Sequence, residues 1–333
     1  MNINSSSVLF LVVLVVSEVH SWNFVSLGLN DTTYRLMHVS TYYIRAFVCI
    51  ETQSKYHPTL VESYWPENFF ALAPKVFPNK LAHRRRDKSK DCNLIQQAML
   101  TQIDSWNRLW MLDKGSRSCK PKIIVYDLLR DNLEVFRIEI DQFRGNEIIT
   151  MKLGPTPTCC QVEEKAYFVV AHKPYLLTFD LLRHTWQKLP ISSRKYDNIQ
   201  QSFPVHPKDI AFGYGNQLLI GEQCGKLFLA NSRGNGTEIQ AEFMGNLIGS
   251  PQGMIIDDVG IMYYLVPKFG AVIRCFPRMG LSTEDNEILS LSSLPIKQIF
   301  FGVQGSVWLA SETPIFAYDH CHRLVENTRV AGG

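Results

Sequence analysis

Short apolar runs separated by turns make up most of the chain. The runs are rich in β-branched and aromatic residues, and Gly, Pro, Asn and Asp stand between them. Such segments are typical of β-strands joined by tight turns, whereas apolar residues at helical spacing are rare in this sequence. The pattern therefore predicts an all-β fold.

One unit of this pattern recurs along the chain. A turn that contains Asn or Gly leads into a strand with an aromatic or large apolar residue, and a second strand follows. The paired segments are 107–113 with 123–127, 165–170 with 175–180, 215–221 with 226–230, 260–265 with 271–276, and 305–310 with 315–319, after a weaker first copy at 43–50. Apolar runs before and after these pairs bring each copy to as many as four strands.

The spacing of the copies favours a propeller. Equivalent residues of successive copies lie 44 to 63 positions apart, at Phe47, Trp110, Phe168, Leu219, Tyr263 and Trp308. This period fits one four-stranded blade per copy, whereas a β-sandwich shows closely spaced turns without a longer period. Blades stacked around an axis bury apolar residues between neighbours, so we expect these six side chains in the core between blades. The sequence thus predicts a six-bladed β-propeller.

The first 21 residues have the pattern of a secretory signal peptide. An apolar run at 8–16 precedes a small or polar segment at 17–21, and Val19 and Ser21 occupy the positions that signal peptidase reads. The run is shorter than the roughly 20 apolar residues of a membrane-spanning helix. We therefore expect a signal peptide at 1–21, one propeller domain at 22–333, and a secreted protein without a membrane anchor. An uncleaved tether is the alternative.

The remaining composition agrees with export. Eight cysteines, an even number, favour disulfide bonds in an oxidising compartment. Asn30 and Asn235 begin glycosylation sequons in turn-like segments. The net charge of +3 is nearly balanced, which argues against nucleic acid as the partner. Because consecutive blades are neighbours, we expect Cys92 to form a disulfide with Cys159 or Cys160.

Several motifs, in this order, resemble the insect Yellow and major royal jelly protein family. They are QIDSWNRLWMLDKG at 102–115, CKPKIIVYDL at 119–128, SPQG at 250–253, GIMYY at 260–264, GSVWLAS at 305–311 and NTRV at 327–330. The resemblance covers essentially the whole mature chain and implies a six-bladed β-propeller. It also implies a secreted protein of cuticle pigmentation, eggshell, royal jelly or saliva. Some members convert dopachrome in melanin synthesis, and salivary members bind biogenic amines in the central channel.

The chain departs from the family at several positions. Trp106 stands where the family usually has a cysteine, so the resemblance leaves Cys119 without its usual partner, and the extra Cys49 is a candidate replacement. Phe276 stands where a Trp is common, and Glu312 stands where a neutral amide is common. A carboxylate at Glu312 would suit a ligand ammonium, and a solvent-facing loop is the alternative role for this residue.

The sequence lacks the common catalytic, phosphate-binding and dinucleotide-binding motifs, and it predicts neither a cofactor nor a metal site. We interpret 320–322, His-Cys-His, as a disulfide cysteine between surface histidines. Propellers usually bind ligands on their axis, where the innermost strands converge. The repeat register places the segment 160–162 there, together with these candidate ligand-binding residues: Gln102, Asp209, Gln252 and Lys297.

Three functional hypotheses remain open. The first is a non-catalytic binding protein, with a small biogenic amine or an indole in the central channel. The second is an enzyme of the dopachrome isomerase type, which would need a general base on the channel; His206 and Asp209 are the candidates. The third is a structural protein that contacts extracellular matrix or cuticle components.

The signal-peptide hypothesis gives a direct prediction. The mature protein should begin at or near Trp22, because cleavage follows Ser21. Mass spectrometry of protein secreted from insect cells measures this N-terminus, and a product that retains Met1 would contradict the hypothesis.

Overall fold

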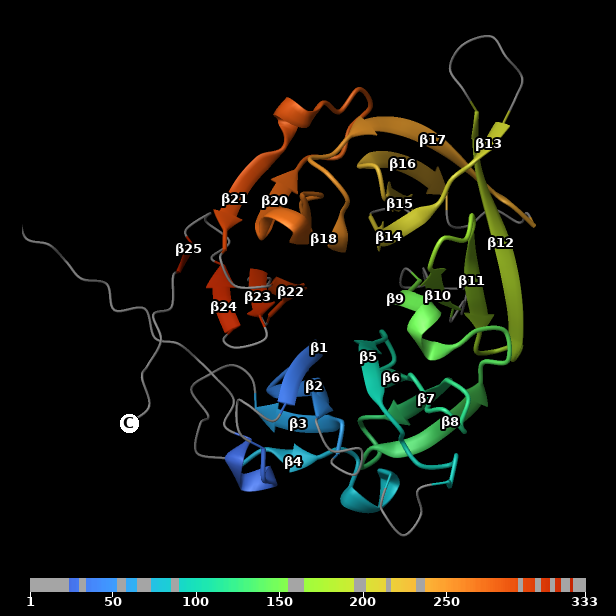
Figure 1. Ribbon diagram of the computed structural model, residues 1–333, viewed down its shortest axis with the longest axis vertical. Helices are drawn as coiled ribbons and strands as arrows, with labels where there is room; N and C mark the ends of the chain where they lie inside the picture. Colours follow the sequence, from blue (N-terminus) through green and yellow to red (C-terminus); the bar gives the residue numbers. More distant parts are fainter. Residues whose placement is uncertain are drawn as a thin grey trace, which may run out of the picture.

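The computed structural model (Figure 1) describes residues 24–29, 34–52, 58–64, 73–84, 90–154, 165–194, 202–213, 217–231, 237–292, 296–302, 307–311, 315–318 and 324–325. The predicted signal peptide and both predicted sequons, at Asn30 and Asn235, lie outside these residues. None of the helices within them is long and apolar enough to cross a membrane.

The described strands form six four-stranded antiparallel blades around a central axis (Figure 1), which confirms the predicted propeller. The first three blades are β1 (Tyr34–Tyr42), β2 (Arg45–Thr52), β3 (Leu60–Tyr64) and β4 (Lys75–Val76); β5 (Ala98–Ile103), β6 (Arg108–Asp113), β7 (Lys122–Asp127) and β8 (Leu133–Glu139); and β9 (Ile148–Leu153), β10 (Lys165–Val170), β11 (Tyr175–Asp180) and β12 (Thr185–Arg194).

The last three blades are β14 (Pro207–Phe212), β15 (Gln217–Glu222), β16 (Lys226–Asn231) and β17 (Ile239–Asn246); β18 (Gln252–Ile256), β19 (Met262–Val266), β20 (Ala271–Cys275) and β21 (Glu287–Leu291); and β22 (Ile296–Phe301), β23 (Val307–Ser311), β24 (Ile315–Tyr318) and β25 (Leu324–Val325). A short strand, β13 (Ser202–Pro204), pairs with β12, and β12 also pairs in parallel with β17, which joins the third and fourth blades at their outer edges. The helical segments are short turns: η1 (Val25–Leu27), η3 (Lys80–Ala82), η4 (Gly145–Glu147), η6 (Pro267–Phe269) and η7 (Thr283–Asp285).

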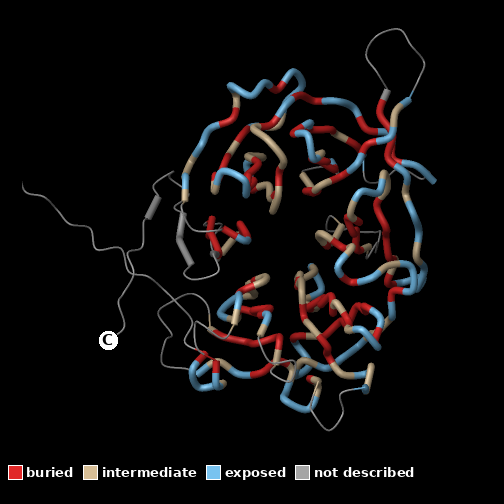
Figure 2. The backbone as a smooth tube through the Cα atoms, viewed as in Figure 1, coloured by how far each residue is buried: buried red, intermediate tan, exposed pale blue. Residues whose placement is uncertain are grey.

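The second strand of each blade carries the core, as the repeat predicted. The six equivalent side chains lie in β2, β6, β10, β15, β19 and β23, and each is buried. They pack in clusters that combine two neighbouring blades, such as Trp110 and Phe168 in the cluster between the second and third blades. Figure 2 shows the burial concentrated in the middle strands and the exposure on the outer ones. A single blade could not hide these faces from water, so the blades stabilise one another.

The turn between β5 and β6 shows how individual residues fix the start of a strand. In the β5–β6 hairpin, Asn107 adopts a positive φ of 61°, a backbone conformation that Asn tolerates better than most residues. Asp104 accepts hydrogen bonds from the backbone N–H of Trp106 and Arg108 and from Nε1 of Trp110. One carboxylate therefore shapes the turn and also fixes the aromatic core residue of the blade.

The disulfide prediction is wrong. Cys92 is bonded to Cys119, with a Cα–Cα distance of 5.2 Å, and Cys49, the proposed partner of Cys119, is a buried free thiol. Cys92 precedes β5 and Cys119 precedes β7. Both strands begin at the same end of the second blade, because Ala98 and Lys122, their first residues, each pair with Asp113 of β6. The chain leaves β9 at the opposite end, so the segment of Cys159 and Cys160, outside the described residues, starts far from Cys92.

A buried ion pair supports the same end of this blade. Nζ of Lys122 lies 2.9 Å from a carboxylate oxygen of Asp113, and both side chains are almost completely buried. Lys122 also donates to the carbonyl oxygens of Cys92 and Leu94, and Asp113 accepts from the backbone N–H of Gln96, Gln97 and Gly115. Since every polar atom has several partners, the pair can be stable although both charges are removed from water.

Removing one member of this pair should destabilise the fold strongly. We expect Lys122→Met to lower the free energy of unfolding by about 3 to 5 kcal/mol, because the Asp113 carboxylate stays buried without its cation. Urea denaturation followed by tryptophan fluorescence measures the change. The matched control is Lys120→Met, which removes an exposed lysine two residues earlier in the chain, and this variant should unfold like the parent protein. Equal stability of the two variants would contradict the role given to Lys122.

Candidate functional site

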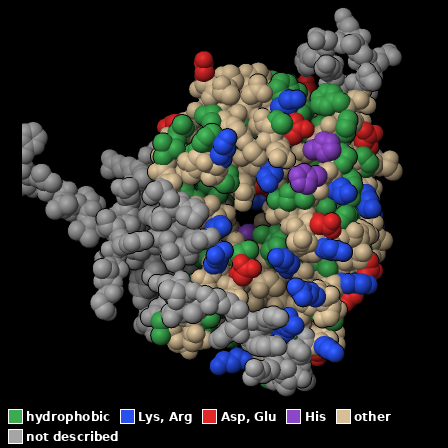
Figure 3. Space-filling model, in the orientation of Figure 1, with side chains coloured by type: hydrophobic (Ala, Val, Ile, Leu, Met, Phe, Trp, Pro, Cys, Tyr) green, Lys and Arg blue, Asp and Glu red, His purple; other side chains and the backbone are tan. Residues whose placement is uncertain are grey.

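An axial cavity of about 590 Å³ lies where the innermost strands of the six blades meet. Its lining comes from β1, β5, β9, β14, β18 and β22, one strand from each blade. Figure 3 shows the molecule hollowed at the centre of the ring on the face turned to the viewer. The volume lies within the range of small-molecule sites.

The structure places Gln102, Asp209, Gln252 and Lys297 on this one cavity, as the repeat register predicted. Gln252 and Lys297 lie at the starts of their strands, whereas Gln102 is the second-last residue of β5, at the other end of the axis. Gln102 also accepts a hydrogen bond from the backbone N–H of Leu153 in the next blade, at 3.1 Å. Glu312 lies outside the described residues, and ligand binding by all five residues stays a prediction.

Asp209 is the buried acid of the cavity. Its two carboxylate oxygens accept hydrogen bonds of 2.8 Å, one from the backbone N–H of Ile210 and one from that of Met254 in the next blade. Burial raises the pKa of Asp209, and the charge of Lys152 and the backbone donors oppose this shift. The carboxylate joins two blades, and its oxygens are already occupied by protein donors.

Lys152 is the functional candidate that sequence reasoning missed. It comes from β9, and its Nζ donates to the carbonyl oxygen of Met254 in β18, at 3.0 Å. Burial lowers the pKa of Lys152, while the charge of Asp209 favours its protonated form. A lysine in an otherwise apolar inner strand was the only signal in the sequence. Lys152 becomes a candidate because Met254 and Asp209, on two other blades, lie next to it. A local sequence pattern does not reveal such neighbours.

His38, in β1, was also missed, and the structure surrounds it with partners. Gln298 is oriented by the backbone of Val39, which donates to its Oε1 at 2.7 Å and accepts from its Nε2 at 2.8 Å. The same Nε2 lies 3.2 Å from Nε2 of His38, and Nδ1 of His38 lies 3.4 Å from both Oγ1 and the backbone nitrogen of Thr101. Burial and the charge of Lys152 lower the pKa of His38 to about 3. His38 is thus a neutral ring with both nitrogens in use.

Of the two base candidates named from the sequence, one lines the cavity. His206 is exposed and does not line it. Asp209 lines the cavity, and each of its oxygens accepts one backbone hydrogen bond. Lys152 is a further candidate for proton transfer, because burial favours its neutral form, which has a lone pair to accept a proton.

The walls of the cavity are mixed. Apolar side chains come from several blades, among them Met37, Met99, Ile255 and Phe301. The described lining contains two lysines, Lys152 and Lys297, and one carboxylate, that of Asp209. This carboxylate already accepts hydrogen bonds from two backbone N–H groups. Such a lining suits a flat apolar molecule with oxygen acceptors better than it suits a second ammonium group.

Comparisons with known proteins agree with this fold and give a short sequence match. No protein-family model matches the chain. A segment of 99 residues is 31% identical to the Dopaminechrome tautomerase of Drosophila melanogaster, and the match covers 26% of this chain and 21% of that protein. The chain therefore matches only about a fifth of the length of this curated relative.

Solved structures with a similar fold are more distant in sequence. Virginiamycin B lyase from Staphylococcus aureus superposes with a TM-score of 0.52 at 11% identity, over 90% of this chain and 85% of that chain. YCF48 from Cyanidioschyzon merolae superposes with a TM-score of 0.52 at 13% identity, over 86% and 83%. At such identities the likeness shows the propeller fold alone.

The electrostatics of the cavity can be tested on Lys152. We expect a pKa below the ordinary lysine value of 10.5, and Asp209→Asn should lower it further, because the variant removes the negative charge that favours the ammonium form. An NMR titration of the lysine side chains measures both values. His38→Gln is the control and should leave the pKa of Lys152 unchanged, since the ring is neutral near pH 7. A Lys152 that titrates with the surface lysines would contradict the assignment.

Proposed function

We propose that this chain is a secreted protein of the Yellow type that binds a flat indole derivative, bearing quinone oxygens, in its axial cavity. The observation that carries the proposal is the single cavity to which six blades contribute both apolar walls and amine and amide donors. The family motifs and the short match to a Dopaminechrome tautomerase support the same ligand class. The predicted signal peptide and the Cys92–Cys119 bond support secretion.

The charges of the cavity favour a quinone over a protonated amine. A ligand ammonium would need an acceptor, and the described lining offers Asp209, whose oxygens already accept from two backbone N–H groups. A quinone oxygen needs donors instead, and Lys152, Gln252 and Lys297 line the same space. A hydrogen bond from a charged donor contributes about 1.5 to 3 kcal/mol, and less at Lys297, whose side chain is exposed to water.

A second candidate function is the tautomerisation of an aminochrome, and the match to a Dopaminechrome tautomerase favours it. The reaction is an isomerisation: a base removes a proton from a ring carbon, the electron pair moves through the conjugated system, and a quinone oxygen gains a proton. It consumes no oxidant or reductant. Lys152 in its neutral form would accept the carbon-bound proton, and a second donor on the cavity would protonate the oxygen.

Ligand binding can be measured with isatin, a stable and flat indole dione that shares two adjacent carbonyl oxygens with an aminochrome, although on the five-membered ring. We expect calorimetry to show binding at one site, with serotonin binding more weakly because it offers an ammonium group. Lys152→Met should weaken isatin binding by about tenfold, since it removes a hydrogen-bond donor that lines the cavity. Lys226→Met, an equal change on an exposed residue of β16, is the control and should bind like the parent protein.

Catalysis requires a separate measurement. Freshly prepared dopaminechrome loses its visible absorbance as it rearranges, and active protein should accelerate this loss relative to a heat-inactivated sample. Lys152→Met should abolish the acceleration. Isatin binding without any acceleration would leave a binding protein, and stronger binding of serotonin than of isatin would overturn the proposed ligand class.

A further inference from the structure

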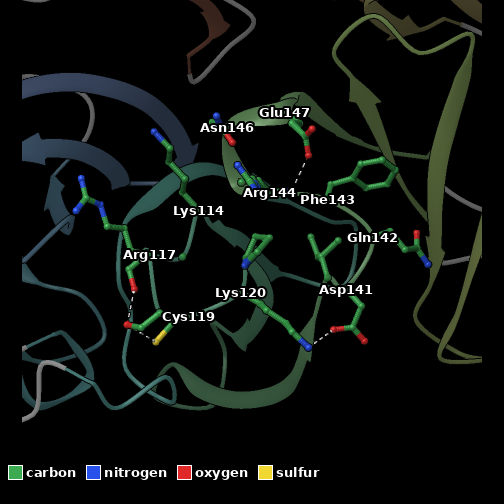
Figure 4. A pocket seen from close by; sticks show the side chains of 16 residues that line it. Lys114, Arg117, Cys119, Lys120, Asp141, Gln142, Phe143, Arg144, Asn146 and Glu147 are labelled. Carbon is green, nitrogen blue, oxygen red and sulfur yellow. Dashed lines mark hydrogen bonds and ion pairs between the residues drawn. The ribbon is translucent and has the colours of Figure 1, made fainter.

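A second hollow lies outside the axial cavity, at one end of the second blade. The β6–β7 connection, 114–121, and the β8–β9 connection, 140–147, line a cleft of about 890 Å³ (Figure 4), here called the basic cleft. Both connections leave the same end of the blade, because Lys122 pairs with Asp113 on one side and with Glu139 on the other. None of the residues of the basic cleft lines the axial cavity.

The walls of the basic cleft are fixed by close backbone contacts. A side chain at Gly145 would overlap the backbone of Lys114, so the two connections touch at this point. Gly115 has a positive φ of 76°, and a side chain there would overlap the backbone of Cys119. The Cys92–Cys119 bond and the buried Lys122–Asp113 pair lie under the same connection. The cleft is therefore a built feature of the fold.

The charges of the basic cleft are unequal. Four cations line it, at Lys114, Arg117, Lys120 and Arg144, against two carboxylates, at Asp141 and Glu147. Both carboxylates are engaged within the walls. Asp141 accepts from Nζ of Lys120 at 2.7 Å, which raises the pKa of that lysine, and Glu147 accepts from the backbone N–H of Arg144 at 2.7 Å.

Three cations of the cleft thus have no carboxylate partner within the described part of the chain: Lys114, Arg117 and Arg144. They come from both walls, and Figure 4 shows Lys114 and Arg117 on one connection and Arg144 on the other. Lys188 adds a further cation near this rim, with its Nζ 5.7 Å from the ring centre of Phe143. Like charges held together repel one another, and a bound anion would relieve the repulsion.

We propose that the basic cleft binds a ligand that carries two or more phosphate or sulfate groups. Arg117 and Arg144 each carry a planar fork of N–H donors that matches such oxyanions, and Lys114 adds a third cation from the β6–β7 connection. A ligand with a single anionic group would satisfy one wall only. The proposal concerns a site separate from the axial cavity and does not depend on the function proposed for that cavity.

Calorimetry with defined anions tests the proposal on the full-length protein. The probes are inorganic phosphate, inorganic pyrophosphate and a fully sulfated heparin tetrasaccharide. We expect one molecule of pyrophosphate or of tetrasaccharide to bind per chain, more tightly than inorganic phosphate binds. Tighter binding of pyrophosphate assigns the cleft to phosphorylated small molecules, and tighter binding of the tetrasaccharide assigns it to sulfated sugars.

The decisive comparison uses two double variants with the same change of charge. Arg117→Gln with Arg144→Gln should weaken binding by about a hundredfold or more, about tenfold for each charged donor. Arg130→Gln with Arg183→Gln removes two exposed arginines from other turns and should bind like the parent protein. Binding lost equally in both double variants, or no binding of either multivalent probe, would overturn the proposal. Thermal unfolding confirms that each variant is folded.

Discussion

Closure of the ring is the constraint on which the rest of the structure depends. Each blade is made of strands that follow one another in the chain, so no exchanged strand links the first blade to the last within the described residues. The first and the last blade meet instead through side chains. Gln298 of β22 makes two hydrogen bonds to the backbone of Val39 in β1, and Trp308 packs into a cluster with β1 and β2. The hydrogen bonds of the Gln298 amide thus connect the first and last blades, which share no β-sheet within the described residues.

Closure also creates the cavity and its chemistry. Because the innermost strands converge on one axis, polar side chains from different blades come within hydrogen-bonding distance. Asp209 connects the fourth and fifth blades, Lys152 reaches from the third to the fifth, and His38 contacts Gln298 across the closure. The low polarity shifts all three titratable groups towards their neutral forms. The contacts that hold the ring together therefore also set the protonation states of the side chains that line the cavity.

The basic cleft depends on a different kind of support. Its walls are loops, and loops keep a charged arrangement only if something underneath restrains them. Here a disulfide, a buried ion pair and two glycine contacts act together, all at the same end of one blade. Three of its cations, Arg117, Lys120 and Arg144, are exposed, and Lys114 is half-buried. The axial cavity instead is enclosed by strands of all six blades and carries buried polar groups.

The sequence by itself determined the strands, the turns and the number of blades. Three local signals carried this information: the apolar runs, the turn residues such as Asp104, and the repeated residue of each second strand. The repeat also placed four residues on the axis, at Gln102, Asp209, Gln252 and Lys297. Only the tertiary structure decided which side chains meet there. Lys152, His38 and Gln298 interact across blades that are distant in the chain, and the partner of Cys92 depends on which strand ends share one side of a blade. Periodicity reports which face of a strand is buried, but the distance between two strands of different blades is fixed by packing around the axis.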